Sequence, residues 1–146
     1  AKTLKKYLGS AYSVKASVGH VKDLPKSRLG VDVENGFAPQ YEVVKGKEKA
    51  LGEIKRQAKL AQRVFLATDP DREGEAISWH LKDMLAARGA LRGKDVRRIT
   101  FNEITKRAVQ EAKDEIAAIR READEDVRAR REEIARQERR TSEGLE

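Results

Sequence analysis

The first half of the chain alternates between short apolar segments and polar turns. Apolar residues spaced three or four apart predict helices, whereas strict alternation of apolar and polar residues predicts half-buried strands. The segment AYSVKASVG shows the second pattern, and a glycine ends each of the first two predicted elements. In chain order the pattern predicts the end of a helix over residues 1–9, a strand over 12–18, a loop over 19–40, a short strand over 41–44 and a helix over 46–61.

The middle of the chain contains a continuous apolar run, RVFLAT, of strand length. Such a run is typical of a strand that helices cover on both faces. After it the pattern predicts a loop at DPDREG, a helix over 73–87, a strand over 96–101 and a helix over 102–112 that Asn102 caps. Strands separated by helices of about 10–15 residues are typical of an α/β domain with a largely parallel sheet.

The composition changes after Ala112, where 20 of the last 34 residues are charged. Apolar residues continue at helical spacing from Val109 to Val127, but the stripe thins to Ile134 and then stops. This pattern predicts a long solvated helix rather than a coiled coil, which needs about three or four sustained heptads. We therefore expect one domain over residues 1–112 and a charged helical extension over 113–146.

Composition limits the classes of protein to which the chain can belong. It contains no cysteine and two histidines, which excludes disulfides and cysteine nucleophiles and argues against a zinc site. No apolar run has the length of a membrane span and no signal peptide begins the chain, so we expect a soluble, cytoplasmic protein without a membrane partner. Residues 1–112 carry 23 Lys and Arg against 14 Asp and Glu, a net charge of +9, which favours a polyanionic partner such as nucleic acid.

Four carboxylates follow the predicted buried strand closely, at Asp69, Asp71, Glu73 and Glu75. The carboxyl end of a strand is where open α/β sheets bind ligands, and alternate positions of an extended segment point the same way. Asp69 and Asp71 can therefore converge, with Glu73 entering from the first helical turn. Carboxylates this close repel one another, and a divalent cation removes the repulsion. Oxygen ligands without sulfur or imidazole favour Mg²⁺ or Mn²⁺.

Other interpretations of the acidic loop start from the same residues. Acidic side chains at a helix start also favour the positive end of the helix dipole, which explains the two glutamates but not the two aspartates as well. A calcium-binding EF-hand loop fits the first half of the segment, but His80 stands at its twelfth position and a strand precedes it. A haloacid-dehalogenase-like phosphotransferase also has Asp-x-Asp after an apolar strand. That class usually has Thr or Val at the position of Glu73, and it remains a minor alternative.

Several sequence blocks follow one another in a fixed order: KTLKKYLG, SVGHVKDLPKSRLGVD, F-x-P-x-Y, ATDPDREGEAISWHL and RITFNEITKRAVQEA. Together they resemble the Toprim domain of bacterial type IA DNA topoisomerases, the topoisomerase I family, over about residues 1–112. The resemblance implies a Rossmann-type sheet, mostly parallel and flanked by helices. The charged segment after Ala112 has no counterpart in this resemblance.

The resemblance also implies a set of site residues. Asp69, Asp71 and Glu73 correspond to the family's acidic cluster, which binds Mg²⁺ and orients a DNA backbone phosphate while a tyrosine of another domain attacks it. We expect Arg72 and Glu73 to act in catalysis, with Arg72 and the metal neutralising charge on the phosphoryl group. DNA, with single strands preferred, is the expected partner, and the residues expected to contact it are His20, Lys22, Lys26, Arg28 and Arg72.

Two features of the family are missing from the sequence. Members of the family begin with an apolar strand that ends in Glu-Ser-Pro-x-Lys and supplies a catalytic glutamate. The chain has no such strand, and Tyr7, Tyr12 and Tyr41 lie outside the family's nucleophile motif. We therefore interpret the chain as a Toprim fragment that works with the remaining topoisomerase domains and cannot relax DNA by itself. The alternatives are a non-catalytic or engineered Toprim scaffold or interaction protein and, as a minor one, a Toprim-type nuclease.

Overall fold

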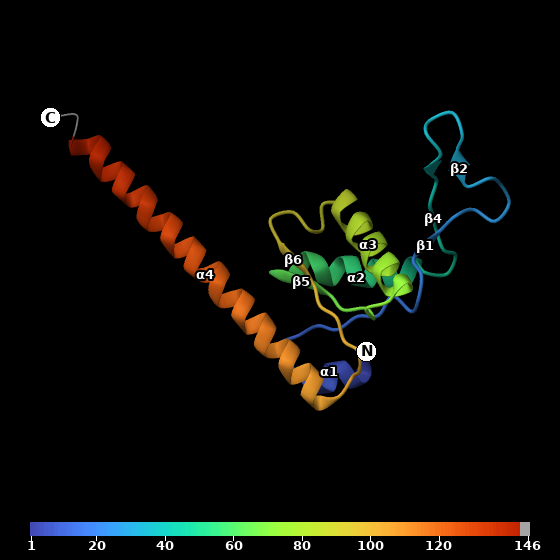
Figure 1. Cartoon of the computed structure of the whole chain (residues 1–146), viewed down its shortest axis with the longest axis horizontal. Coiled ribbons are helices and arrows are strands. Elements are labelled where there is room, and N and C mark those ends of the chain that lie inside the picture. Colours follow the sequence, from blue (N-terminus) through green and yellow to red (C-terminus); the bar gives the residue numbers. More distant parts are fainter. Residues whose placement is uncertain (144–146) are drawn as a thin grey trace. The chain divides into compact units, whose positions relative to one another are not determined.

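The computed structural model describes residues 1–143, and the chain divides into two units, Ala1–Thr105 and Lys106–Glu146. The end of the predicted extension, residues 144–146, lies outside the described residues. Within residues 1–143 no helix combines the length and the hydropathy that crossing a lipid bilayer requires. In chain order the elements, coloured from blue to red in Figure 1, are α1 (Lys2–Leu8), β1 (Lys22–Asp23), β2 (Val31–Asp32), β3 (Ala38–Pro39), β4 (Glu42–Val43), α2 (Glu48–Leu60), β5 (Arg63–Leu66), α3 (Arg72–Ala87), β6 (Asp95–Arg98) and α4 (Lys106–Glu143).

A parallel pair of strands forms the centre of the first unit. β5 and β6 pair in register from Arg63↔Asp95 to Leu66↔Arg98, and α3 connects them. This β–α–β arrangement, with α2 and α3 beside the strands in Figure 1, confirms the predicted α/β class. The described residues add two short antiparallel pairs, β1 with β4 and β2 with β3. β1, β2 and β3 are each two residues long, which is too short for an alternating pattern, so the sequence predicted an uninterrupted loop over residues 19–40. β4 lies within the short strand predicted over 41–44.

The strand predicted over residues 12–18 is absent from the described structure, so that prediction is wrong. A strand needs a neighbouring backbone to complete its ladder, whereas this segment contacts α2 through side chains. Ser13 Oγ donates to Gln57 Oε1 at 3.1 Å, and Lys15 Nζ lies 2.7 Å from Glu53 Oε1. The side chains that contact the helix are the polar ones, and Val18 is 73% exposed, so the alternation of apolar residues does not mark a strand here.

The last helix begins later than predicted. Asn102 does not cap it, because residues 102–105 are non-helical and α4 begins at Lys106. Thr105, directly before the helix, is a residue type that also caps helices well. From there α4 continues for 38 residues with Val127 and Ile134 exposed, which confirms the predicted long solvated helix. The domain limit expected at residue 112 falls inside this helix and stays a prediction.

Two helices turn apolar faces towards the parallel strands. On α3 the buried residues Ile77, Leu81 and Leu85 recur at every fourth position, as expected for the inner face of an amphipathic helix. The larger buried cluster consists of Val21, Leu66, Ile77 and Leu81, and a smaller one of Ala58, Leu85 and Ala90. Because these clusters join α2, β5 and α3, they also place the loop that connects β5 to α3.

Replacing Leu81 by alanine removes a side chain that is 8% exposed from the larger cluster. The cavity and the lost burial are expected to lower the free energy of unfolding by about 2–5 kcal/mol. Leu60, the last residue of α2, is 76% exposed and provides the matched control. L60A is expected to change the free energy of unfolding by less than about 0.5 kcal/mol. Denaturant titrations followed by circular dichroism measure both values, and equal losses would contradict the core position of Leu81.

Candidate functional site

The loop between β5 and α3 carries the predicted acidic residues at the carboxyl end of a parallel strand. β5 ends at Leu66, and α3 begins at Arg72 with Asp71 as its N-cap. Asp71 has an extended backbone, with φ −122° and ψ 174°, and its Oδ1 accepts a hydrogen bond from the backbone N of Gly74 at 2.6 Å. One carboxylate oxygen of Asp71 thus satisfies a free N–H group of the first helical turn, while the other stays available to a ligand.

Gly74 brings the first turn of α3 into direct contact with this loop. A Cβ atom at position 74 would collide with the backbone carbonyl of Asp69. Thr68 Oγ1 donates to the carbonyl oxygen of Gly74 at 2.6 Å and lies 2.7 Å from Ser78 Oγ. The loop and the start of the helix are therefore packed together without space for a side chain at position 74.

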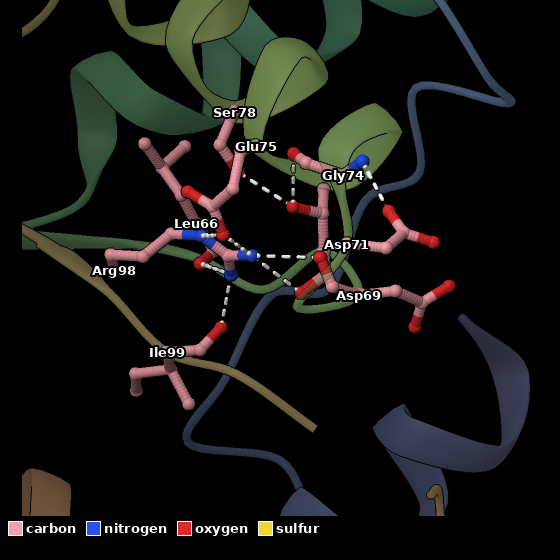
Figure 2. A network of polar contacts seen from close by, with 9 residues as sticks. Leu66, Asp69, Asp71, Gly74, Glu75, Ser78, Arg98 and Ile99 are labelled. Carbon is pink, nitrogen blue, oxygen red and sulfur yellow. Dashed lines mark hydrogen bonds and ion pairs between the residues drawn. The ribbon is translucent and has the colours of Figure 1, made fainter. Parts of the chain in front are cut away.

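Arg98, the last residue of β6, connects the loop to the neighbouring strand. Its side chain is 24% exposed, and its guanidinium lies among backbone carbonyls (Figure 2). Glu75 Oε1 accepts from Nε at 3.1 Å and from Nη2 at 2.7 Å. The other acceptors are the carbonyl oxygens of Leu66 at 2.9 Å, Thr68 at 2.8 Å, Asp69 at 3.0 Å, and Ile99. One side chain thus links both parallel strands, the loop and α3.

Gly74 and Arg98 are not among the residues that the sequence predicted for the site. For Arg98 a signal exists, because alternate residues of a strand share a face and Arg98 stands two positions after the partly buried Val96. For Gly74 the signal is weaker, because glycine is common in loops for reasons of backbone conformation alone. Neither residue carries the acidic chemistry that drew attention to the loop.

The carboxylates of Asp69 and Asp71 lie on the same side of the loop and point away from the guanidinium of Arg98 (Figure 2). Two carboxylates with only oxygen donors fit Mg²⁺, which typically takes one or two carboxylates and keeps several waters. Within residues 1–143, no three Asp, Glu or His side chains form a group that holds a metal ion. The structure therefore presents a pair of aspartates, and the predicted set of three ligands stays a prediction.

Glu73, the third predicted ligand, contacts His20 in this structure. Glu73 Oε1 lies 3.1 Å from His20 Nε2, and the two side chains are 64% and 48% exposed. This contact joins the SVGH segment to the first turn of α3 and brings together two residues predicted for one site. Arg72, the first residue of α3, is also exposed. Solvent therefore reaches all three side chains, and so can a ligand.

The other residues expected to contact DNA have acidic partners or lie in the loop before β2. Lys22 Nζ lies 2.8 Å from Asp83 Oδ2, and this hydrogen bond and the lysine charge lower the pKa of Asp83. Asp83 stands in the second half of α3, roughly 18 Å along the helix from its N-cap. Arg28 Nη2 lies 2.6 Å from Glu42 Oε1, whereas Lys26 is exposed. The structure thus does not gather these cations at the acidic loop, and their contact with DNA stays a prediction.

A group of aromatic rings covers the middle of α3. His80 is 6% exposed and packs edge-to-face against Tyr41, with ring centroids 4.4 Å apart, and against Trp79 at 5.1 Å. His80 is thus a packing residue, whereas Trp79 is 59% exposed. Burial and, less strongly, the charge of Lys22 lower the pKa of His80. Its Nδ1 atom is buried without a hydrogen-bond partner in the described part of the chain, which is consistent with an uncharged ring.

Comparison with known proteins identifies the domain that contains this loop. The family described as "Toprim domain" matches residues 1–104. The chain belongs to the Toprim family. DNA topoisomerase 1 of Xylella fastidiosa is 53% identical to this chain over 112 residues, which are 77% of this chain and 14% of that protein. The structure of full-length topoisomerase I from Thermotoga maritima is 48% identical, with a TM-score of 0.64, and the match covers 77% of this chain and 18% of that one.

These similarities confirm the resemblance found in the sequence blocks. The chain contains a Toprim domain of the type IA topoisomerase kind, with the expected α/β fold. It spans less than a fifth of the length of either bacterial topoisomerase. The activities of the full-length relatives are therefore an argument for the function of this Toprim domain and not an observation made on it.

Substitution of Gly74 by alanine tests the close contact between α3 and the loop. G74A is expected to lower the free energy of unfolding by about 2 kcal/mol or more, because the backbone of Asp69 must move. Gly52 in α2 has open space around the position of a Cβ and is the matched control. G52A is expected to raise the free energy of unfolding by about 0.5–1 kcal/mol through helix propensity. Denaturant titrations in which the free energy of unfolding changed with the same sign in both variants would refute the contact.

The lowered pKa of His80 predicts a dependence of stability on pH. In the unfolded chain the ring titrates at about 6.5, whereas in the folded chain it titrates at a lower pH. Between these two values the unfolded state binds more protons, so the free energy of unfolding falls as the pH drops below about 6.5. The folded pKa is read from the His80 ring signals in a ¹H–¹³C NMR titration.

H80F removes the titrating group and is expected to flatten the stability curve between about pH 6.5 and the folded pKa of His80. Denaturant titrations at a series of pH values measure that slope in both proteins. A ring signal of His80 that titrates at or above its ordinary pKa, or an unchanged slope in H80F, would contradict the buried, uncharged state.

Proposed function

We propose that this Toprim domain supports single-strand DNA cleavage and religation by a type IA topoisomerase, an isomerase of DNA topology. It binds Mg²⁺ through Asp69, Asp71 and Glu73 and holds a backbone phosphate of the strand that is cut. The observation that carries the proposal is the common orientation of the Asp69 and Asp71 carboxylates at the carboxyl end of β5 (Figure 2). The 53% identity to a protein named DNA topoisomerase 1 supports the same reaction.

In this proposal, different residues of the chain have different roles at the bound phosphate. A bound Mg²⁺ supplies positive charge at a phosphate oxygen. Asp71 keeps Oδ1 on the N–H of Gly74 and offers its second oxygen to the cation. Glu73 is exposed, so its side chain can exchange the contact with His20 for the metal, and His20 then becomes a donor for the phosphate. Arg72, exposed at the start of α3, adds charge to neutralise the phosphoryl group during cleavage.

Recognition of DNA in this proposal depends on charge and not on base identity. Residues 1–112 carry a net charge of +9, and Lys and Arg side chains contact phosphates without reading the sequence. Lys26 is exposed, while Lys22 and Arg28 exchange acidic partners for phosphate. The affinity for a single strand is therefore weak and falls with salt. The attacking tyrosine and the remaining topoisomerase domains are further partners, and the location is cytoplasmic.

A non-catalytic Toprim scaffold is the second candidate function. It is favoured by the ion pairs of Glu73 with His20 and of Glu75 with Arg98, which engage two of the four acidic side chains within the protein. A scaffold of this kind binds neither Mg²⁺ nor DNA at the loop, so metal titration separates it from the leading proposal. Cleavage of nicked or single-stranded DNA with Mg²⁺ or Mn²⁺, without a covalent protein adduct, would instead indicate a nuclease.

Titration of the ¹⁵N-labelled chain with Mg²⁺ is expected to shift the backbone amides of the loop, residues 68–74 except Pro70, before all others. D69N and D71N are each expected to weaken Mg²⁺ binding by about tenfold or more, because each removes a charged ligand. D71N is especially informative, since asparagine retains the helix cap while losing the charge. Dissociation constants follow from the amide shifts at increasing Mg²⁺ concentration.

Glu34 provides the matched control, because it is an exposed carboxylate that belongs to the segment between β2 and β3 and not to the acidic loop. E34Q is expected to bind Mg²⁺ as the unmodified chain does. Amide shifts that occur elsewhere, with residues 68–74 unmoved, would refute the proposed metal site.

A further inference from the structure

We infer that Arg98 is a positioning residue for the proposed metal site and that Glu75 is its counter-ion rather than a metal ligand. The inference rests on the proposed function, because it assigns to these two residues the task of orienting Asp69 and Asp71 towards one cation. It concerns the side of the loop opposite the aspartate carboxylates, where the guanidinium lies (Figure 2).

The hydrogen bonds of Arg98 fix the path of the backbone between β5 and α3. Its guanidinium binds the carbonyl oxygen of Leu66 at 2.9 Å, that of Thr68 at 2.8 Å and that of Asp69 at 3.0 Å. These three carbonyls belong to the end of β5 and to the first half of the loop. Because they are turned towards Arg98, the loop has little freedom to rotate about its ends. The side chains of the loop therefore have a defined direction before any ligand binds.

Only a guanidinium can serve all of these acceptors at once. Arginine presents five N–H donors in a planar fork, whereas the ammonium group of lysine donates from a single atom. In this structure Nη1, Nη2 and Nε of Arg98 all donate, and the acceptors lie in the strand, the loop and the helix. A lysine at position 98 keeps the charge but reaches few of these oxygens. Geometry and charge can therefore be separated by a single substitution.

The ion pair with Glu75 reduces the repulsion between Arg98 and a cation bound at the loop. A positive guanidinium next to the loop opposes the binding of a cation to Asp69 and Asp71. Glu75 Oε1 accepts two hydrogen bonds from Arg98, at 3.1 and 2.7 Å, and so neutralises its charge locally. The fourth carboxylate of the acidic segment thus has a task that differs from those of the other three. It preserves the negative potential of the two aspartates while the guanidinium holds their backbone.

The neighbouring arginine offers a control of the same type in the same strand. Arg97 is 53% exposed, and its Nε lies 2.7 Å from Asp95 Oδ1. Successive residues of a strand point to opposite faces, so Arg97 is directed away from the carbonyls that Arg98 binds. R97K therefore changes an arginine of β6 without touching the loop.

The test uses the 146-residue chain and Mg²⁺ alone as the probe. R98K is expected to weaken Mg²⁺ binding by about tenfold or more, as is usual when the groups that orient metal ligands are lost. In the metal-free protein, the amides of residues 67–69 and 71 are expected to exchange with solvent faster in R98K than in the unmodified chain. R97K is expected to match the unmodified chain in both measurements. Thermal unfolding by circular dichroism establishes that each variant is folded at the temperature used.

A second variant covers the case in which R98K does not fold. E75Q retains the oxygen that accepts from Arg98, but it removes the negative charge. Its loop amides are expected to exchange as in the unmodified chain, while Mg²⁺ affinity falls on the order of tenfold at low salt because the guanidinium charge is no longer neutralised.

The outcomes separate the inference from the proposed function. Wild-type Mg²⁺ affinity in a folded R98K, or in E75Q, would overturn the inference and leave the metal site of the proposed function intact. If the unmodified chain shows no Mg²⁺ response at residues 68–74, the proposed function fails and the inference fails with it. Weakened binding in R98K and E75Q, with R97K unchanged, supports both.

Discussion

The close approach of α3 to the loop before it is the constraint on which the site depends. The backbone turns sharply between a parallel strand and a helix, and its carbonyl groups leave the sheet without strand partners. Gly74 permits the helix to touch the carbonyl of Asp69, and Arg98 supplies donors to the carbonyls that remain. The acidic side chains thus extend from a backbone that is fixed by contacts on the opposite side of the loop. Charge on the outer side of the loop is tolerated because packing and hydrogen bonds on the other side fix its shape.

The elements that the sequence predicted well are those in which burial alone decides the pattern. The helix expected over residues 73–87 is α3, Arg72–Ala87, and the helix expected over 46–61 is α2, Glu48–Leu60. Both have an apolar face that one layer of strands covers. The expected strand over residues 12–18 fails because alternation alone does not show whether a neighbouring strand is present, and here polar side chains contact α2 while Val18 is 73% exposed.

The candidate site shows a similar division. Spacing and position after an apolar strand predicted that the carboxylates of Asp69 and Asp71 lie on the same side of the loop, because a strand end fixes the direction of alternate side chains. Figure 2 shows them so, and their role as metal ligands stays a prediction. Spacing did not reveal that Glu73 contacts His20 or that Glu75 contacts Arg98, since both partners are distant in sequence. Long-range ion pairs depend on how strands and loops cross, which a local pattern does not contain. The four acidic residues of the segment therefore lie in three different environments in the fold.

The exposed ring of Trp79 has an optical consequence. The sequence contains a single tryptophan, and the structure places it on α3, edge-on to the rings of Tyr41 and His80. Indole emission from this chain therefore originates from one helix only. That helix begins at the acidic loop and packs on the parallel strands through Ile77 and Leu81. The chain thus carries an intrinsic fluorophore on the element that connects its core to its candidate site.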